Sequence, residues 1–285
     1  AGKAGSVSVM DIYTGELIAL HSSPTFDPNL FLYGIDSEEW KKILQDPLKP
    51  LMNKSIAGLY SPGSTIKPIV ALSVLENDVI STKFKVYCTG KTEFYEQTYH
   101  CWKKKGHRSV NLREALKQSC DTYFYEAARL LGVDRLNETA KKFGLGEKVF
   151  DNMFIEEKKG VVPSTKWKKE VIGENWYLGE TLINGIGQGY IQTTPLQLCL
   201  MTAQLANGGF KIFPKLVVEK NQKTYEEIKY TIDKNLEDFK KVKKDSFIEK
   251  GSEFFNKFSK SNYPLFRNPE NVKFVLDAMY GSTNE

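Results

Sequence analysis

One serine and one lysine stand three residues apart in Ser64-Thr65-Ile66-Lys67, the only Ser-x-x-Lys of this 285-residue sequence. Positions three apart share a helix face, so the hydroxyl and the amine can meet. A serine hydroxyl attacks well only when a nearby base takes its proton, and a buried lysine can be that base. The pair therefore predicts acyl transfer through Ser64. For a lone match a helix-capping serine is the commoner explanation, but Pro68 is awkward within a helix, and local rules tend to be broken at functional sites.

A second serine lies in Ser119-Cys120-Asp121, at the junction of two expected helices. A hydroxyl at such a junction can face a cleft and pass protons. The alternative is structural, with Ser119 at the end of one helix and Asp121 as the N-cap of the next. By itself this motif does not distinguish the two explanations.

Three cysteines, Cys88, Cys101 and Cys120, flank His107 within one short region. These four residues are the ligand types of a closed zinc site, although their spacing is wider than in a zinc finger. The distribution suggests a site more than a disulfide framework. A disulfide between Cys88 and Cys101, or plain thiols, are the alternatives. His100 adjoins Cys101 and is a less favoured substitute for His107.

Turn residues, helix caps and apolar periodicity predict the elements that must position these side chains. A helix over residues 64–77 would carry the first serine and the lysine at its start. Asn111 is a good N-cap for a helix that ends near Ser119, and Asp121 would cap the next helix, which stops at Gly132. The other expected elements are a hairpin over Val7–Leu20, a short helix over Glu38–Leu44, a helix capped by Asp134 and ended by Gly144, and an apolar central helix over Leu196–Ala206, with Thr194–Gln197 as its capping box and Cys199 in the core.

The composition is that of a globular chain, with 41% apolar, 26% charged and 12% aromatic residues. The net charge of +5 is mild for this length and does not indicate nucleic-acid binding. Gly185–Tyr190 lacks the patterns of phosphate-binding loops. No apolar run reaches the roughly 18–20 residues of a membrane span, and no signal peptide is evident. Since the chain begins at Ala1, we expect an excised domain, from which an upstream anchor could have been removed.

The two serine motifs, in this order and separation, resemble those of the penicillin-binding proteins and serine β-lactamases. Tyr60–Pro68 is similar to the nucleophile segment of the high-molecular-weight transpeptidases. Gly185–Gly189, followed by Thr194–Gln197, resembles their loop and central helix behind the active site, and Val9–Glu16 and Ser23–Asn29 resemble their first strands and loop. The resemblance covers nearly the whole chain. It implies an α/β (α+β) fold in which helical layers flank an antiparallel sheet.

Within this family the chain looks closest to the penicillin-binding protein 2 group, the monofunctional enzymes of cell elongation. The segments that carry this closer match are Asp27–Phe31, Trp102–Lys104, Gly106-His107 and Asp121–Tyr125. Asp121 agrees with the aspartate that this group has in the second motif. Some members hold a structural zinc near the active site, and the resemblance implies zinc ligands at Cys88, Cys101, His107 and Cys120. Other members have carboxylates at the first two positions, where thiolates should hold zinc more tightly.

The resemblance also implies a mechanism and partners. Ser64 would attack the D-Ala-D-Ala carbonyl of a peptidoglycan stem peptide, with Lys67 as general base. Ser119, positioned with Asp121, would relay a proton towards the departing amine. The acyl group would then pass to an amine of a second stem peptide, whereas β-lactam antibiotics would acylate Ser64 and stay. A membrane glycosyltransferase and the cell-elongation machinery are the expected partners, and the chain would be the periplasmic domain of an inner-membrane-anchored protein.

The third family motif, Lys-Ser/Thr-Gly on a core strand, is absent. Ala278–Glu285 resembles the stretch just before it, so residues 1–285 would be a transpeptidase domain that is incomplete at its C-terminus, and weakly active or inactive alone. Residues 214–262, rich in lysine and glutamate, are expected to be a charged insertion or a surface helix pair. Two alternatives stay open: a D,D-carboxypeptidase or β-lactamase that hands the acyl group to water, and a non-catalytic penicillin sensor or zinc-stabilised scaffold.

Overall fold

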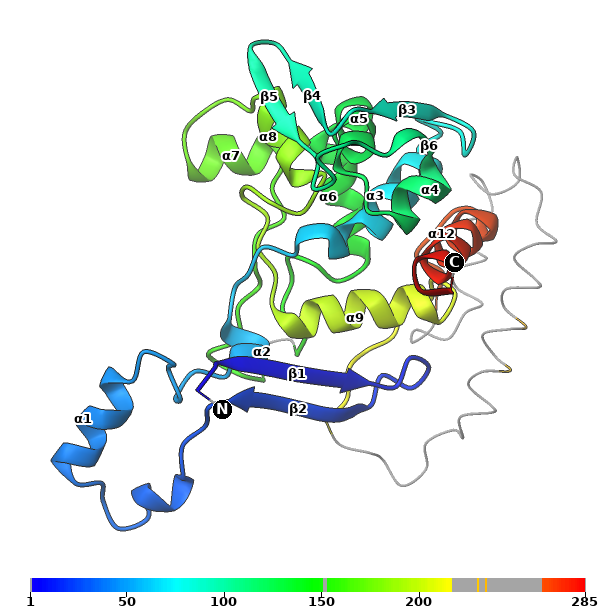
Figure 1. Cartoon of the computed structure of the whole chain (residues 1–285). Coiled ribbons are helices and arrows are strands. Elements are labelled where there is room, and N and C mark those ends of the chain that lie inside the picture. Colours follow the sequence, from blue (N-terminus) through cyan, green and yellow to red (C-terminus); the bar gives the residue numbers. More distant parts are fainter. Residues whose placement is uncertain (1, 151–152, 217–229, 231–233, 235–262, 285) are drawn as a thin grey trace.

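A computed structural model describes residues 2–150, 153–216, 230, 234 and 263–284 (Figure 1). The first elements are β1 (Gly5–Met10), β2 (Leu17–Ser23), η1 (Pro28–Phe31), α1 (Ser37–Gln45), α2 (Lys54–Ala57), η2 (Gly63–Ile66) and α3 (Lys67–Glu76). They are followed by β3 (Lys85–Cys88), β4 (Lys91–Phe94), β5 (Gln97–His100), β6 (Arg108–Asn111), α4 (Leu112–Lys117), α5 (Asp121–Leu131), α6 (Val133–Lys142), α7 (Thr165–Val171), α8 (Leu178–Asn184), α9 (Pro195–Ala206) and α12 (Pro269–Asn284). Within the described ranges the strands form three antiparallel pairs, β1–β2, β3–β6 and β4–β5.

The predicted N-terminal hairpin is confirmed as β1 and β2. Asp11 closes the turn between them, because its Oδ1 accepts hydrogen bonds from the backbone N–H groups of Tyr13 at 2.9 Å and Thr14 at 2.7 Å. α9 lies along this hairpin (Figure 1), and its Leu200 belongs with Met10 to one buried apolar cluster. The hairpin and α9 thus form a layer at one side of the helical body.

The main core surrounds α3, whose residues from Ile69 to Leu75 are all buried. α5, α6 and α12 pack against it and contribute Phe124, Leu136 and Val275, each at most 3% exposed. Burying one large apolar side chain stabilises the fold by about 1.5–3 kcal/mol. Because α3 is enclosed by these partners, the residues at its N-terminus have a fixed position.

The start of α3 differs from the prediction, which placed Ser64 within the helix. Ser64 lies in the 3-10 turn η2, and the α-helix begins with Lys67. Pro68 occupies the first turn of α3, where its missing N–H is not needed. The interpretation of Pro68 as a broken helix rule was therefore wrong. The unusual backbone belongs to Gly63, which has a φ of +57°.

Two predicted N-caps were also wrong. Cys120, whose backbone is extended, is the N-cap of α5, and Asp121 is its first helical residue. α6 begins at Val133, and Asp134 instead accepts hydrogen bonds from the backbone N–H and the hydroxyl of Thr165, both at 2.9 Å. Because Asp121 does not cap α5, its carboxylate is available to the residues around it.

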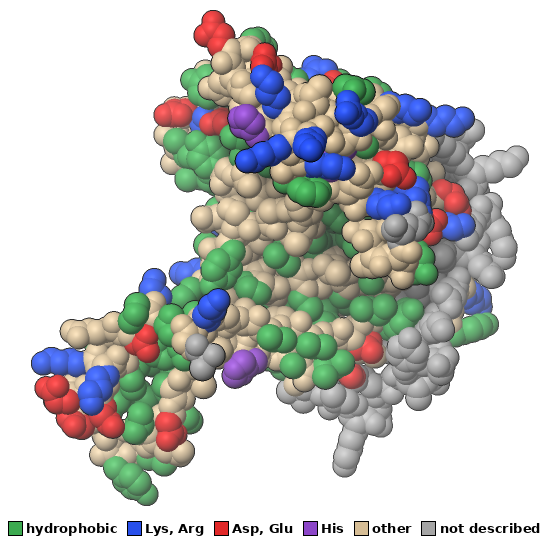
Figure 2. All heavy atoms as spheres, viewed as in Figure 1, with side chains coloured by type: hydrophobic (Ala, Val, Ile, Leu, Met, Phe, Trp, Pro, Cys, Tyr) green, Lys and Arg blue, Asp and Glu red, His purple; other side chains and the backbone are tan. Residues whose placement is uncertain are grey.

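Two further predicted features are confirmed, whereas β3 to β6, α2, α7, α8 and α12 were not predicted. The Thr194 capping box opens α9, and the helix expected over residues 38–44 is α1. α1 belongs to an arm, residues 24–53, which stands apart from the body and bears exposed apolar side chains such as Tyr33 and Leu44 (Figure 2).

Cys199 is half-buried and packs at the edge of the smaller core cluster. Most of the predicted insertion, 214–262, lies outside the described residues. No described helix is long and apolar enough to cross a membrane.

Candidate active site

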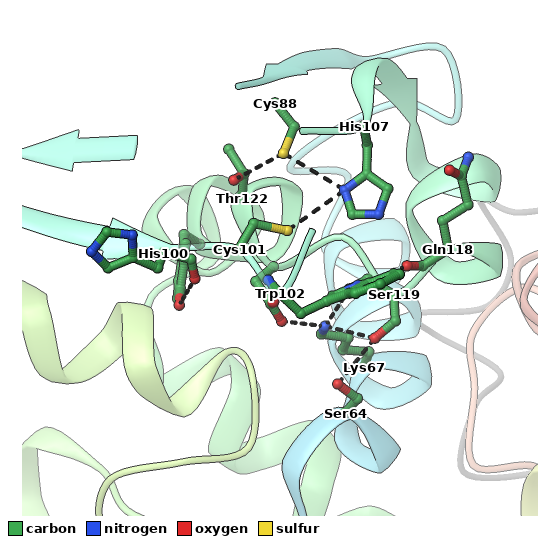
Figure 3. Close-up of polar contacts among 12 residues, drawn as sticks. Ser64, Lys67, Cys88, His100, Cys101, Trp102, His107, Gln118, Ser119 and Thr122 are labelled. Atoms are coloured by element: carbon green, nitrogen blue, oxygen red, sulfur yellow. Dashed lines mark hydrogen bonds and ion pairs between the residues drawn. The ribbon is translucent and has the colours of Figure 1, made fainter. Parts of the chain in front are cut away.

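Ser64, Lys67 and Ser119 meet where η2 and α3 approach the junction of α4 and α5 (Figure 3). The Ser119 hydroxyl donates to the Ser64 hydroxyl oxygen at 3.0 Å, although 55 positions separate the two serines. The Lys67 amine donates to the Ser119 hydroxyl oxygen at 2.9 Å. Lys67 therefore reaches Ser64 through Ser119, a connection that the Ser-x-x-Lys spacing alone did not predict.

Lys67 is 2% exposed, and its charge has a partner. Its Nζ donates to the Ser119 carbonyl at 3.0 Å and to Asp121 Oδ1 at 2.6 Å, and it lies 5.4 Å from the centre of the Phe124 ring. Removing one partner of such a buried ion pair typically destabilises a protein by about 3–5 kcal/mol. Asp121 therefore fixes the amine at the point where it meets Ser119.

The backbone of Ser119 is left-handed, with a φ of +52°. For a residue with a side chain this conformation costs about 1–2 kcal/mol, and it persists only where the surroundings hold it. The Ser119 N–H donates to the Leu116 carbonyl at 3.2 Å, and the Cys120 N–H to the Ala115 carbonyl at 2.9 Å. These bonds end α4 just before the turn, which brings the Ser119 hydroxyl to Ser64.

The glycine-rich loop 185–189 supports the turn that carries Ser64. The Gly63 N–H donates to the Gly187 carbonyl at 2.9 Å. Gly187 has a φ of +75°, and a Cβ there would lie 2.1 Å from the Gly63 carbonyl oxygen. Only glycine allows so close an approach in this conformation. The loop therefore packs directly on the segment that holds Ser64.

A pocket of about 540 Å³ opens beside the two serine hydroxyls. Ser64, Ser119 and Asp121 lie in its wall, together with Trp102 and Gln188. A concave site of this size, with a few convergent polar groups, can hold a small ligand or part of a longer one. The sequence did not identify Trp102 and Gln188 as pocket residues. Each was noted only as part of a longer segment that resembles the family, and no separate signal marked it.

Cys88, Cys101, His107 and Cys120 form a buried cluster whose possible ligand atoms all lie within 4.8 Å of one another. His107 Nδ1 is 3.6 Å from the Cys88 sulfur and 3.5 Å from the Cys101 sulfur (Figure 3). A tetrahedral zinc ion, with bonds of about 2.3 Å to sulfur and about 2.0 Å to nitrogen, would hold such atoms about 3.5 Å apart. The donor set and its spacing therefore fit a metal ion.

The chemistry of the sulfurs also favours a cation. A hydrogen bond from the Cys120 thiol holds the pKa of Cys101 well below its usual range, and the same hydrogen bond, together with burial, raises the pKa of Cys120. An anionic sulfur in a buried place needs a positive partner. The four cysteines are free rather than disulfide-linked. His100 lines the pocket and lies outside the cluster, so the histidine of the cluster is His107 (Figure 3).

Comparisons with known proteins agree with this geometry. A family profile described as "Penicillin binding protein transpeptidase domain" matches residues 5–251. The chain is 40% identical to peptidoglycan D,D-transpeptidase MrdA of Escherichia coli strain K12 over 220 residues, which are 76% of this chain and 35% of that protein. It is 37% identical to MrdA of Acinetobacter baumannii over 219 residues, 76% of this chain and 32% of that protein. The chain thus spans about a third of the length of these relatives.

Solved structures show the same fold. Pseudomonas aeruginosa PBP2, in complex with WCK 5153, matches 98% of this chain and 57% of that chain, with a TM-score of 0.79 and 35% identity. Helicobacter pylori PBP2, in complex with MreC, matches 81% of this chain and 44% of that chain, with a TM-score of 0.73 and 33% identity. The predicted α/β (α+β) fold and the resemblance to the penicillin-binding protein 2 group are confirmed. Since the family profile covers most of the residues, the chain belongs to the penicillin-binding protein transpeptidase domain family.

Proposed function

We propose that this chain is the catalytic part of a peptidoglycan D,D-transpeptidase, in which Ser64 forms an acyl-enzyme with a stem peptide. The observation that carries the proposal is the continuous line of hydrogen bonds from Ser64 through Ser119 to Lys67 and Asp121. It supports a serine nucleophile with a base and a proton relay in place. The description of the E. coli relative as a D,D-transpeptidase favours this reaction over others.

The arrangement provides a route for the proton that Ser64 must lose. When Lys67 has given up one proton, its amine keeps N–H bonds to the Ser119 carbonyl and to Asp121, and its lone pair faces the Ser119 hydroxyl. The two hydroxyls then turn, so that Ser64 donates to Ser119 and Ser119 donates to Lys67. As Ser64 Oγ bonds to the carbonyl carbon of the stem peptide, its proton passes to Ser119 and the Ser119 proton passes to Lys67. Ser64 thus loses one proton, Ser119 gains one and loses one, and Lys67 gains one.

The same groups complete the reaction in the opposite direction. The bond to the terminal D-alanine breaks, and its amine takes a proton from Ser119, which Lys67 resupplies. An amine of a second stem peptide then attacks the ester carbonyl and loses a proton along the same route. Ser64 regains its hydrogen when the new amide bond forms. A β-lactam would follow the first half of this sequence and remain attached to Ser64.

We further propose that zinc occupies the cysteine–histidine cluster. The support is the close spacing of the ligand atoms, their burial and the lowered pKa of Cys101. When bound, zinc would hold three thiolates and one imidazole together as a structural crosslink. Because Cys120 lies between Ser119 and Asp121, the crosslink would restrain the second serine motif.

The relatives also suggest partners. H. pylori PBP2 was solved in complex with MreC, and a neighbour with 26% identity belongs to a peptidoglycan synthase complex that coordinates polymerization and crosslinking. For this chain we propose a membrane glycosyltransferase and the cell-elongation machinery as partners, stem peptides as substrates and β-lactams as inhibitors. A periplasmic location, in a protein anchored in the inner membrane, is part of the same proposal.

Labelling with a fluorescent penicillin tests the nucleophile. Protein extended past Glu285 to a Lys-Ser/Thr-Gly motif should be labelled covalently, and Ser64→Ala should abolish the label. Ser61→Ala is the matched control, because Ser61 is an exposed serine on the same segment and should leave labelling unchanged. Absence of label on the unsubstituted protein would contradict an acyl-enzyme. Sustained hydrolysis of nitrocefin would instead indicate transfer to water.

A further inference from the structure

Trp102 connects the cysteine–histidine cluster to the second serine motif (Figure 3). It follows Cys101 directly, and its ring meets the His107 ring edge-on, with 5.4 Å between their centres. The indole Nε1–H donates to the carbonyl of Ser119 at 3.0 Å and to that of the preceding residue at 3.1 Å. The backbone N–H donates to Asp121 Oδ2 at 3.0 Å. Trp102 thus binds both the Ser119 carbonyl and the Asp121 carboxylate of the second serine motif.

We propose that Trp102 is a positioning residue for the transpeptidase reaction, which transmits the geometry of the cluster to Ser119 and Asp121. Packing into a core does not explain its contacts, because 63% of Trp102 is exposed and it lines the pocket. The inference rests on the proposed function, since it concerns how fast Ser64 is acylated.

The Ser119 carbonyl shows what the indole contributes. It accepts hydrogen bonds from Trp102 Nε1 and from Lys67 Nζ, both at 3.0 Å, and so uses both of its lone pairs. Without the indole, the left-handed Ser119 backbone loses one of the contacts that hold it. The carbonyl would then turn towards Lys67 alone. The Ser119 hydroxyl moves with this backbone, so its 3.0 Å contact with Ser64 would be disturbed.

The two oxygens of the Asp121 carboxylate bind the same two residues, Lys67 and Trp102. Lys67 binds Oδ1, and the Trp102 backbone N–H binds Oδ2. The two bonds fix the rotation of the carboxylate, which in turn fixes the direction from which Lys67 meets Ser119. Trp102 therefore acts on the relay from two sides, through its side chain and through its backbone.

The loop that carries Trp102 is itself firmly held. The Cys101 N–H donates to the Gly90 carbonyl at 2.9 Å. Gly106, at the far end of the loop, has a φ of +75°, and a Cβ there would lie 2.1 Å from the Cys88 carbonyl oxygen. Both ends of the loop are thus packed against the cluster, and Trp102 has little freedom to follow a displaced Ser119.

Trp102→Phe separates the hydrogen bond from the ring, because phenylalanine keeps an aromatic face and lacks the N–H. In protein that is acylated by a fluorescent penicillin, we expect the acylation rate constant to fall about five- to tenfold, the worth of one ordinary hydrogen bond. The dissociation constant of the initial complex should not change. Trp40→Phe, on the arm that carries α1, is the matched control and should leave both values as they were.

A second variant distinguishes the donor from the shape of the ring. Benzothienylalanine at position 102 has the outline of tryptophan with sulfur in place of the N–H, and it should reproduce the slower acylation of Trp102→Phe. Of the four tryptophans, Trp102 is the one in the pocket wall. Acylation should therefore change the tryptophan emission of the unsubstituted protein and of Trp40→Phe, but not that of Trp102→Phe.

The outcomes separate this inference from the function on which it rests. If the unsubstituted protein is not acylated, the proposed function fails. If it is acylated and both Trp102 variants react at its rate, the positioning role is refuted. The role is equally refuted if acylation slows only together with loss of metal and a lower melting temperature, because Trp102 would then be merely structural.

Discussion

Replacing Asp121 by asparagine should reduce both stability and acylation, because the carboxylate uses both of its oxygens. Oδ1 accepts from Lys67 at 2.6 Å, and Oδ2 accepts from the Trp102 backbone N–H at 3.0 Å. An asparagine side chain keeps one oxygen and turns an NH₂ group towards the other donor. Either Lys67 or Trp102 then faces a donor where it had an acceptor.

The magnitude follows from burial. The side chains of Lys67 and Asp121 are 2% and 12% exposed, so solvent screens little of the loss. A hydrogen bond to a charged group contributes about 1.5–3 kcal/mol, and a buried group left unsatisfied costs about 1–3 kcal/mol. Asparagine retains one acceptor, so we expect a loss of about 3 kcal/mol, at the lower end of the range for a broken buried ion pair. In a chain of this size that lowers Tm by roughly 6–12 °C.

Thermal unfolding and labelling with a fluorescent penicillin measure the two effects. Glu126→Gln is the matched control, because it makes the same change on the same helix, α5. Glu126 pairs with Arg129 at 2.7 Å, but these side chains are 23% and 37% exposed, and such a pair is worth at most about 1 kcal/mol. Equally small Tm shifts in the two variants, with unchanged labelling of Asp121→Asn, would refute the reasoning.

The remaining predictions concern the metal and the glycine-rich loop. A chelator should lower Tm by at least about 10 °C in calorimetry, because structural zinc sites contribute many kcal/mol of folding free energy. Serine is a better N-cap than cysteine but a poorer metal ligand, so in Cys120→Ser the chelator should lower Tm much less. An unchanged Tm of the unsubstituted protein on chelation would exclude structural zinc. Gly187→Ala should slow acylation on the order of a hundredfold, since its Cβ would displace Gly63. Gly173 also has a positive φ, +82°, but a Cβ there would meet nothing within 4 Å. Gly173→Ala should therefore be acylated at the rate of the unsubstituted protein, and it shows whether a positive φ alone slows the reaction.

Local patterns predicted those parts of the fold that depend on neighbours in the sequence. The capping box of Thr194 and the N-cap at Asn111 were predicted correctly, because a cap involves residues only three positions apart. The placement of Asp121 as an N-cap was wrong by one residue. An aspartate is favourable both as N-cap and in the first turn, so its type does not distinguish the two positions.

The connections within the site could not be predicted in this way. The contact between Ser64 and Ser119 joins residues 55 positions apart, and that between Lys67 and Asp121 joins residues 54 apart. Trp102 reaches the motif across another 17 positions. Such contacts are set by how α3, α5 and the loop between β5 and β6 pack, which no spacing rule encodes. The ligand types of the cysteine–histidine cluster were recognisable because metal chemistry restricts the residue types more than the spacing.

The N-terminus of α5 indicates why a cluster of this kind would stand beside the relay. Cys120 is the N-cap, yet its side chain makes no cap hydrogen bond to the helix, so α5 lacks a contribution of about 1 kcal/mol that serine or aspartate would supply. The Cys120 sulfur points into the cluster instead. The next residue back, Ser119, holds a left-handed backbone that is itself unfavourable. The missing cap hydrogen bond at Cys120 and the left-handed backbone of Ser119 are both unfavourable, and they persist only if contacts with distant residues offset them. The cluster supplies such contacts to Cys120, and Trp102 and Lys67 supply them to Ser119. Disrupting the cluster should therefore also disturb the position of the Ser119 hydroxyl, on which the proposed proton transfer depends.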